Sequence, residues 1–98
     1  MTVLRIDHFT VDPARAEDLI HRRNDLVAAV RKAVPGLLEA RLARKDDRTW
    51  IDLWRWDTHA NAQAAVDLAR SGALPEAAAA FELATDVSTE FTEVIDER

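Results

Sequence analysis

The chain has 98 residues, 48% hydrophobic and 32% charged, a composition typical of one soluble globular domain with a modest core. Eighteen acidic residues against 13 basic ones give a formal charge of −5 without a basic arm, which argues against a nucleic-acid partner. The lack of cysteine excludes disulfides, thiolate metal sites and a cysteine nucleophile, and it fits a reducing cytoplasm. We expect a single domain over residues 1–98, with neither a secretion signal nor a membrane span.

The first half of the chain predicts a strand, a long helix and a second strand. Residues 3–11 are rich in β-branched and aromatic side chains and stop at Asp12-Pro13. Pro13 suits the first turn of a helix capped by Asp12, and apolar residues recur at helical spacing until Pro35-Gly36. Residues 37–44 are predicted to be extended.

The second half completes a β-hairpin and adds two helices and a strand. After a polar turn, residues 49–57 are rich in aromatic and β-branched side chains. Thr58 caps a second helix that ends at Gly72, Pro75 opens a further short helix, and residues 87–95 form the last strand. This order predicts an α+β fold of the ferredoxin-like kind, a four-stranded antiparallel sheet with helices on one face.

Alternation along the predicted strands separates two unlike faces of the sheet. One face collects plain aliphatic side chains, namely Leu4, Ile6, Leu38, Leu42, Ile51 and Leu53. Such residues suit packing against helices, so we predict that this face is the core. The other face mixes aromatic and charged side chains, namely Arg5, Asp7, Phe9, Arg41, Trp50, Asp52, Trp54 and Trp56. That mixture is typical of a ligand pocket.

The tryptophans also predict an assembly. If helices cover the aliphatic face, then Trp50, Trp54 and Trp56 are open to water in a monomer, each with roughly 150–250 Å² of surface. A contiguous aromatic patch of this size usually marks an interface, and two such faces packed together would enclose a barrel-like cavity. We therefore expect a homodimer.

Three short motifs make the sequence similar to the antibiotic biosynthesis monooxygenase family. They are Val11-Asp12-Pro13 after the first strand, Val34-Pro35-Gly36 before the second, and Trp56-Asp57-Thr58 at the entry to the second helix. The resemblance covers nearly the whole chain. It implies a dimeric α+β barrel and a monooxygenase that works without a metal, flavin or other cofactor.

Two branches of the resembling family differ in the residues that line their cavities. In the anthrone-oxidising branch, a Trp at the position of Trp56 and an Asn four residues earlier line the substrate cavity. This chain keeps the Trp but has Asp52 in place of the Asn, and a carboxylate can act as a base where an amide cannot. The haem-degrading branch uses an Asn on the first strand and a Trp and a His in the second helical region. This chain has Asp7, about Ala65 and about Pro75 at those positions, so all three residues are missing and haem degradation is disfavoured.

The resemblance and the mixed face together predict a site. Asp52 and Asp7 are the candidate catalytic bases, which would deprotonate a planar anthrone, phenol or quinol-like substrate. We expect Asp52→Asn to lower turnover at least as much as Asp7→Asn. The candidate substrate-binding residues, for the ring and for a phenolate or carboxylate of the ligand, are Arg5, Phe9, Arg41, Trp50, Trp54 and Trp56.

Other functions stay open on the same residues. A similar pocket would serve a non-oxidative cyclase or isomerase acting on a polyketide-like compound. Alternatively, neighbouring arginines neutralise the acids and the tryptophans only pack, which would make the chain a non-catalytic binding module. His8, which is placed with Ile6 toward the helices, shares no face with His21 or His59, so no metal site is expected.

Overall fold

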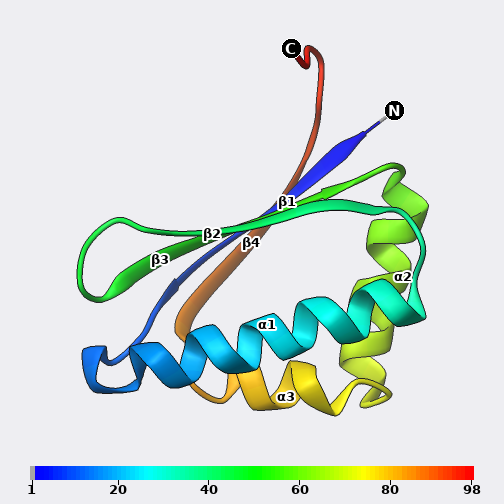
Figure 1. The fold of residues 1–98 in the computed structure, drawn as a ribbon. Helices are drawn as coiled ribbons and strands as arrows, with labels where there is room; N and C mark the ends of the chain where they lie inside the picture. Colours follow the sequence, from blue (N-terminus) through cyan, green and yellow to red (C-terminus); the bar gives the residue numbers. More distant parts are fainter. Residues whose placement is uncertain (1) are drawn as a thin grey trace.

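The computed structural model describes residues 2–98 as one sheet with helices on one side (Figure 1). The strands are β1 (Val3–Thr10), β2 (Leu37–Arg44), β3 (Thr49–Trp56) and β4 (Thr85–Glu93). They pair antiparallel in the order β2-β3-β1-β4. The helices are η1 (Pro13–Arg15), α1 (Ala16–Ala33), α2 (His59–Ser71) and α3 (Pro75–Phe81). The predicted α+β, ferredoxin-like arrangement is confirmed.

Local signals explain where α1 begins and ends. The side chain of Asp12 accepts a hydrogen bond from the backbone N–H of Ala14 at 3.0 Å, and residues 13–15 wind as a 3-10 turn. The α-helix therefore starts one turn later than predicted. It ends before Val34, because this residue precedes Pro35 and takes the extended conformation that a following proline favours.

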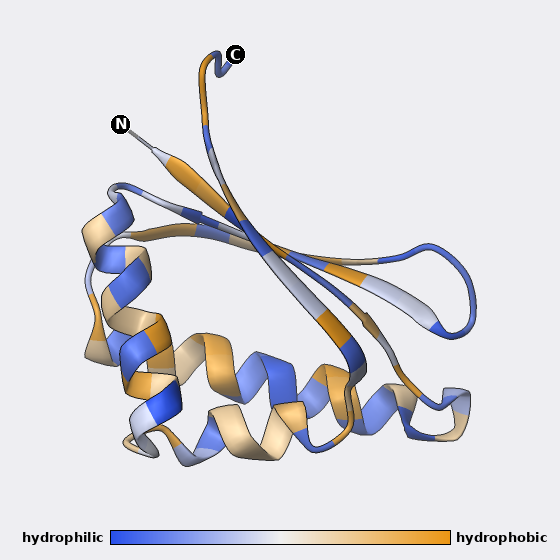
Figure 2. Ribbon diagram, turned by 180° about the vertical axis from the view of Figure 1, so that it is seen from behind, coloured by the Kyte–Doolittle hydropathy of each residue, from blue (hydrophilic) through white to orange (hydrophobic). Residues whose placement is uncertain are grey.

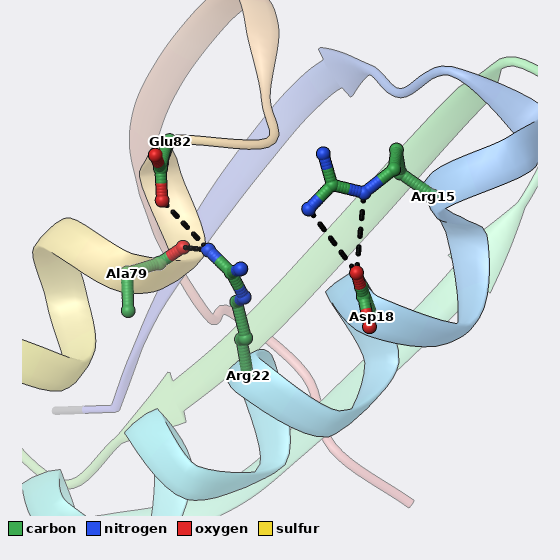
Figure 3. Close-up of polar contacts among 5 residues, drawn as sticks. All are labelled: Arg15, Asp18, Arg22, Ala79 and Glu82. Atoms are coloured by element: carbon green, nitrogen blue, oxygen red, sulfur yellow. Dashed lines mark hydrogen bonds and ion pairs between the residues drawn. The ribbon is translucent and has the colours of Figure 1, made fainter.

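The second helical segment follows its predicted caps. The hydroxyl of Thr58 accepts a hydrogen bond from the backbone N–H of Asn61 at 3.1 Å, which starts α2. Gly72, with φ of 81°, ends it in the left-handed conformation that favours glycine. Across the helical layer, Arg22 of α1 donates hydrogen bonds to the carbonyl of Ala79 at 2.9 Å and to the carboxylate of Glu82 at 2.8 Å. These bonds tie α3 and the residue after it to α1 (Figure 3).

The last strand begins two residues earlier than predicted and contains a bulge. The register of β4 against β1 shifts between His8 and Thr10, so that Asp86 and Val87 together face Phe9. Asp86 takes a positive φ of 51° at this point. The bulge lies at the start of β4, directly after the connection from α3.

The structure reverses the predicted assignment of the two faces. Trp50 and Trp54 are 4% exposed and Trp56 is 1% exposed, because all three lie on the face that the helices cover. Small residues on α2 and α3 leave room for the indole rings of Trp54 and Trp56, and those in the same buried cluster are Ala62, Ala65, Ala77 and Ala80. The helices of the same chain therefore shield the tryptophans from water. The prediction of a homodimer from exposed tryptophans was thus argued from a wrong premise.

The opposite side of the sheet, which we call the open face, has no helix over it among residues 2–98 (Figure 1). Its aliphatic side chains are the half-buried Leu4, Ile6, Ile51 and Leu53, which were predicted to be core. The strands carry both hydrophilic and hydrophobic residues (Figure 2). His8 also lies here, 3.9 Å from Glu90, rather than toward the helices.

Strand β2 is shifted by one residue from the predicted alternation. Leu42 pairs with Asp52 and packs on the helix-covered face, whereas Arg41 pairs with Leu53 on the open face. The pairing with β3 sets this placement, because one register holds from Glu39 to Arg44 and changes only between Leu37 and Glu39. Leu38, at the irregularity itself, is exposed. No described helix is both long and apolar enough to cross a bilayer.

Candidate active site

A small cavity of about 40 Å³ lies between the sheet and the helical layer. Five of the predicted site residues line it, three from β1 and two from β3, namely Arg5, Asp7, Phe9, Asp52 and Trp54. The helices contribute Leu19, Arg23 and Leu26 from α1. The rest of the lining is Ala80, Phe81, Ala84 and Val87, of which Phe81 and Val87 are exposed to solvent. The cavity thus has aromatic and aliphatic walls around a small set of charged groups.

The two acids are direct neighbours across the sheet. Asp7 of β1 pairs with Asp52 of β3, and both side chains are buried. Like charges directly opposite one another destabilise a sheet, and a buried carboxylate needs a partner. The two acids satisfy this need in different ways.

Asp52 is held by a bidentate ion pair with Arg23 of α1. The guanidinium donates from Nε to Oδ2 at 3.2 Å and from Nη2 to Oδ1 at 3.0 Å. Both side chains are nearly closed off from water, at 11% exposed for Arg23 and 8% for Asp52. The same guanidinium lies 5.9 Å from the centre of the Trp54 ring. Each oxygen of Asp52 thus already accepts a charge-assisted hydrogen bond from Arg23.

Asp7 is held more loosely. The hydroxyl of Thr89 donates to Oδ1 at 2.5 Å, and Nε of Arg5 lies 3.5 Å from the same oxygen. Burial raises the pKa of Asp7 and the negative charge of Asp52 adds to the rise, while Arg5 and Thr89 oppose it. Both contacts fall on Oδ1, which leaves Oδ2 as the oxygen for exchanging a proton. Asp7 therefore fits a general base better than Asp52 does.

Arg5 is the second cation of the cavity. Its side chain is mostly buried, and its Nε has no hydrogen-bond partner within residues 2–98. At 3.5 Å from Asp7 it makes an ion pair but not a close hydrogen bond. It is placed to stabilise negative charge on a bound molecule.

Three predicted substrate-binding residues lie away from this cavity. Trp56 is buried among Val3, Val30 and other core residues, and Trp50 packs in a second cluster. The indole N–H groups of Trp50 and Trp56 are buried without a hydrogen-bond partner in the described part of the chain. Arg41 lies on the open face and forms an ion pair with Glu39. The structure thus gives Trp50 and Trp56 packing positions and places Arg41 on the other side of the sheet.

The residues that sequence reasoning missed come from the helical layer. Arg23 lies four residues after Leu19 and three before Leu26, so it sits on the apolar stripe of α1. A cation on a buried helix face indicates a buried acid opposite it, and this signal was available. Phe81 and Val87 flank the connection from α3 to β4, where no periodicity indicated a role. Within residues 2–98, no three His, Asp or Glu side chains gather as a metal site would require.

Many solved structures resemble this one. SnoaB, a cofactor-independent oxygenase from Streptomyces nogalater, is 26% identical with a TM-score of 0.72 over 98% of this chain and 95% of that one. A protein from Caulobacter crescentus, described as an antibiotic biosynthesis monooxygenase, is 18% identical with a TM-score of 0.78 over 97% and 91% of the two chains. Rv0793 from Mycobacterium tuberculosis is 21% identical with a TM-score of 0.70 over 99% and 98%.

No protein-family model matches the sequence, and no curated protein sequence matches it either. The structural similarity nevertheless spans almost the full length of each chain compared. The resemblance to the antibiotic biosynthesis monooxygenase family is therefore confirmed, and the chain has the fold of that family.

Proposed function

We propose that this protein is a cofactor-free monooxygenase for a planar anthrone, phenol or quinol-like substrate, which enters the small cavity between sheet and helices as the exposed side chains of Phe81 and Val87 at its mouth move aside. The observation that carries the proposal is Asp7, a buried carboxyl with a raised pKa in the wall of an aromatic-lined cavity. Similarity to SnoaB, a cofactor-independent oxygenase, supports the same reaction class.

The first step is removal of a proton by Asp7. An anthrone loses a proton from its ring methylene, and the resulting carbanion is stabilised by delocalisation and by the nearby guanidinium of Arg5. The carbanion then passes one electron to O₂, and superoxide combines with the substrate radical and a proton to form a hydroperoxide. Loss of water leaves a carbonyl group, so one O₂ converts the methylene to a ketone and releases one water.

Asp52 and Arg23 support this step without exchanging protons. Their bidentate pair fixes a negative charge opposite Asp7, which makes Asp7 more basic than Thr89 and Arg5 alone would allow. Trp54 and Phe9 wall the cavity and keep water from the reactive intermediate. Asp52 is therefore a positioning residue in this mechanism, and Asp7 is the catalytic base.

The proposal is tested by oxygen uptake with 1,8-dihydroxyanthrone and protein treated with a chelator. Wild type should consume O₂ faster than buffer, and Asp7→Asn should reduce kcat by about 10²–10⁴-fold, the usual contribution of a general base. Asp47→Asn, an exposed acid in the β2–β3 turn, is the matched control and should keep full activity. No uptake above buffer would contradict the oxygenase and favour a cyclase or isomerase that uses the same base.

We further propose that the protein is a homodimer in which a second copy covers the open face. The aliphatic side chains of Leu4, Ile6, Ile51 and Leu53 would supply an apolar centre. Charged residues beside them are already paired, with Arg55 lying 3.5 Å from the Glu39 carboxylate. The arrangement resembles an interface with an apolar core and a polar rim.

A further inference from the structure

The hydrogen bond from Thr89 is the shortest polar contact that the side chain of Asp7 makes within residues 2–98. Thr89 lies in β4 directly opposite Asp7 in β1, and its hydroxyl donates to Oδ1 at 2.5 Å. Nε of Arg5 lies 3.5 Å from the same oxygen, beyond the range of a close hydrogen bond. Hydroxyl–carboxylate contacts of about 2.5–2.7 Å are typical of charge-assisted hydrogen bonds. The hydroxyl therefore holds the carboxylate more firmly than the neighbouring cation does.

Thr89 differs from the other threonines of its strand. The hydroxyl of Thr85 donates to the backbone carbonyl of Thr10 at 3.4 Å, and Thr92 lies on the open face opposite Leu4. Among the threonines of β4, Thr89 is the one whose hydroxyl meets an acid. Its strand is an edge of the sheet, and its side chain is exposed and belongs to neither buried cluster. The hydroxyl thus serves Asp7 rather than the core.

A carboxyl without this contact would be free to turn. The terminal torsion of an aspartate side chain is broad and two-fold, so Oδ1 and Oδ2 exchange places unless a bond fixes one of them. Burial raises the pKa of Asp7, and the hydrogen bond from Thr89 opposes that rise because it stabilises the charged form. A base has to be both ionised and correctly oriented, and one hydroxyl supports both.

We propose that Thr89 is a positioning residue for the base, whose hydroxyl anchors Oδ1 of Asp7 and so presents Oδ2 to the substrate. The inference rests on the proposed function for the reaction itself. The proton leaves the ring methylene of the substrate and goes to Oδ2 of Asp7, while the hydroxyl proton of Thr89 stays on its own oxygen throughout. Thr89 therefore acts through Asp7 and exchanges no proton with the substrate.

The hydroxyl can be removed without changing any charge near Asp7. The charged groups around it come from its own strand, from β3 and from helices α1 and α2, namely Arg5, His8, Asp52, Arg23 and Arg70. Thr89→Val keeps all of them and removes one hydrogen-bond donor. Valine has nearly the shape of threonine and suits a strand, so the fold should be retained. Thr89→Ser keeps the donor and should behave like wild type.

The first test is a pH titration of the Asp7 carboxyl carbon by ¹³C NMR, with the signal assigned by its loss in Asp7→Asn. Thr89→Val should move the midpoint upward by about one pH unit, because a hydrogen bond to a charged group is lost. Thr89→Ser should restore most of the shift. Thr92→Val is the matched control, since Thr92 is exposed on the same strand but on the opposite face, and it should leave the midpoint unchanged.

The second test is the pH dependence of hydrogen–deuterium exchange at the ring methylene of 1,8-dihydroxyanthrone. Thr89→Val should move the acid limb of the profile upward by the same amount, whereas a merely structural defect would lower the rate without moving the limb. An unchanged midpoint in Thr89→Val, an equal shift in Thr92→Val or no recovery in Thr89→Ser would overturn the inference. The titration needs no turnover, so a shifted midpoint without exchange in wild type would keep the hold of Thr89 on Asp7 and refute the oxygenase.

Discussion

Replacing Arg23 with methionine removes the cation that neutralises Asp52 and keeps much of the side chain's bulk. The pair lies almost entirely out of water and is joined by two hydrogen bonds of 3.0 and 3.2 Å. Removing one member of such a pair costs about 3–5 kcal/mol, because the other charge stays buried without compensation. That is a large fraction of the roughly 5–15 kcal/mol by which a small domain is stable.

The assay is urea unfolding followed by tryptophan fluorescence, because Trp54 lies beside the pair. Arg23→Met should lower the free energy of unfolding by the amount above. Adding Asp52→Asn to this variant should restore part of the loss, because the uncompensated charge disappears. Partial restoration separates the loss of charge balance from a simple loss of packing.

An exposed ion pair provides the internal comparison. Arg15 and Asp18 lie 3.1 Å apart on successive turns near the start of α1, with side chains 46% and 56% exposed (Figure 3). Pairs of this kind contribute about 0–1 kcal/mol, so Arg15→Met should change stability little. If Arg23→Met costs no more than Arg15→Met, Asp52 is not a buried anion that depends on Arg23, and its assignment as a positioning residue is wrong.

Three further predictions concern the pH response, a tight turn and the open face. Burial raises the pKa of Asp7 above its ordinary 3.8, so wild type should lose stability relative to Asp7→Asn as the pH rises from about 4 through the raised pKa. Urea titrations of both proteins measure this, and a constant difference would contradict it. Gly36→Ala should destabilise more than Gly72→Ala, because a Cβ at Gly36 would lie 2.2 Å from Oδ1 of Asp57 whereas Gly72 faces open space; thermal unfolding of both variants should show it, and equal losses would refute it. Leu53→Glu should convert a dimer of twice the 11.0 kDa chain mass to a monomer in light scattering, and equal masses for both proteins would exclude this interface.

The order and type of the elements could be predicted because the local signals agree with one another. Thr58, Gly72 and Pro75 each mark a helix boundary that the structure contains. Boundaries moved where a tertiary or turn preference intervened, as in the 3-10 turn after Asp12 and the bulge at Asp86. Local chemistry thus sets the elements to within about a turn.

The side of the sheet that faces the helices could not be predicted from alternation. A period of two shows which residues share a face, but it does not say which face the helices cover. The missing information was in the helices, where small residues such as Ala62 and Ala77 require large partners on the sheet. Trp54 and Trp56 fill that space, and aliphatic residues such as Leu53 are left on the open face.

The strand residues of the site could be predicted, whereas the helical ones were missed. Asp7, Asp52 and Trp54 share a face by alternation alone, and the structure brings them together. The partner of Asp52 depends on how α1 crosses the sheet, which no local pattern reveals. Arg23 nevertheless carried a signal, since a charge on the apolar stripe of a helix needs a buried counter-charge.

The most direct test of proton removal by Asp7 is hydrogen–deuterium exchange at the ring methylene of 1,8-dihydroxyanthrone, followed by NMR in D₂O without oxygen. Excluding O₂ isolates the first step from everything that follows it. Wild type and Asp47→Asn should catalyse exchange well above buffer, and Asp7→Asn should bring it close to the buffer rate. Exchange that is as fast with Asp7→Asn as with wild type would contradict the account.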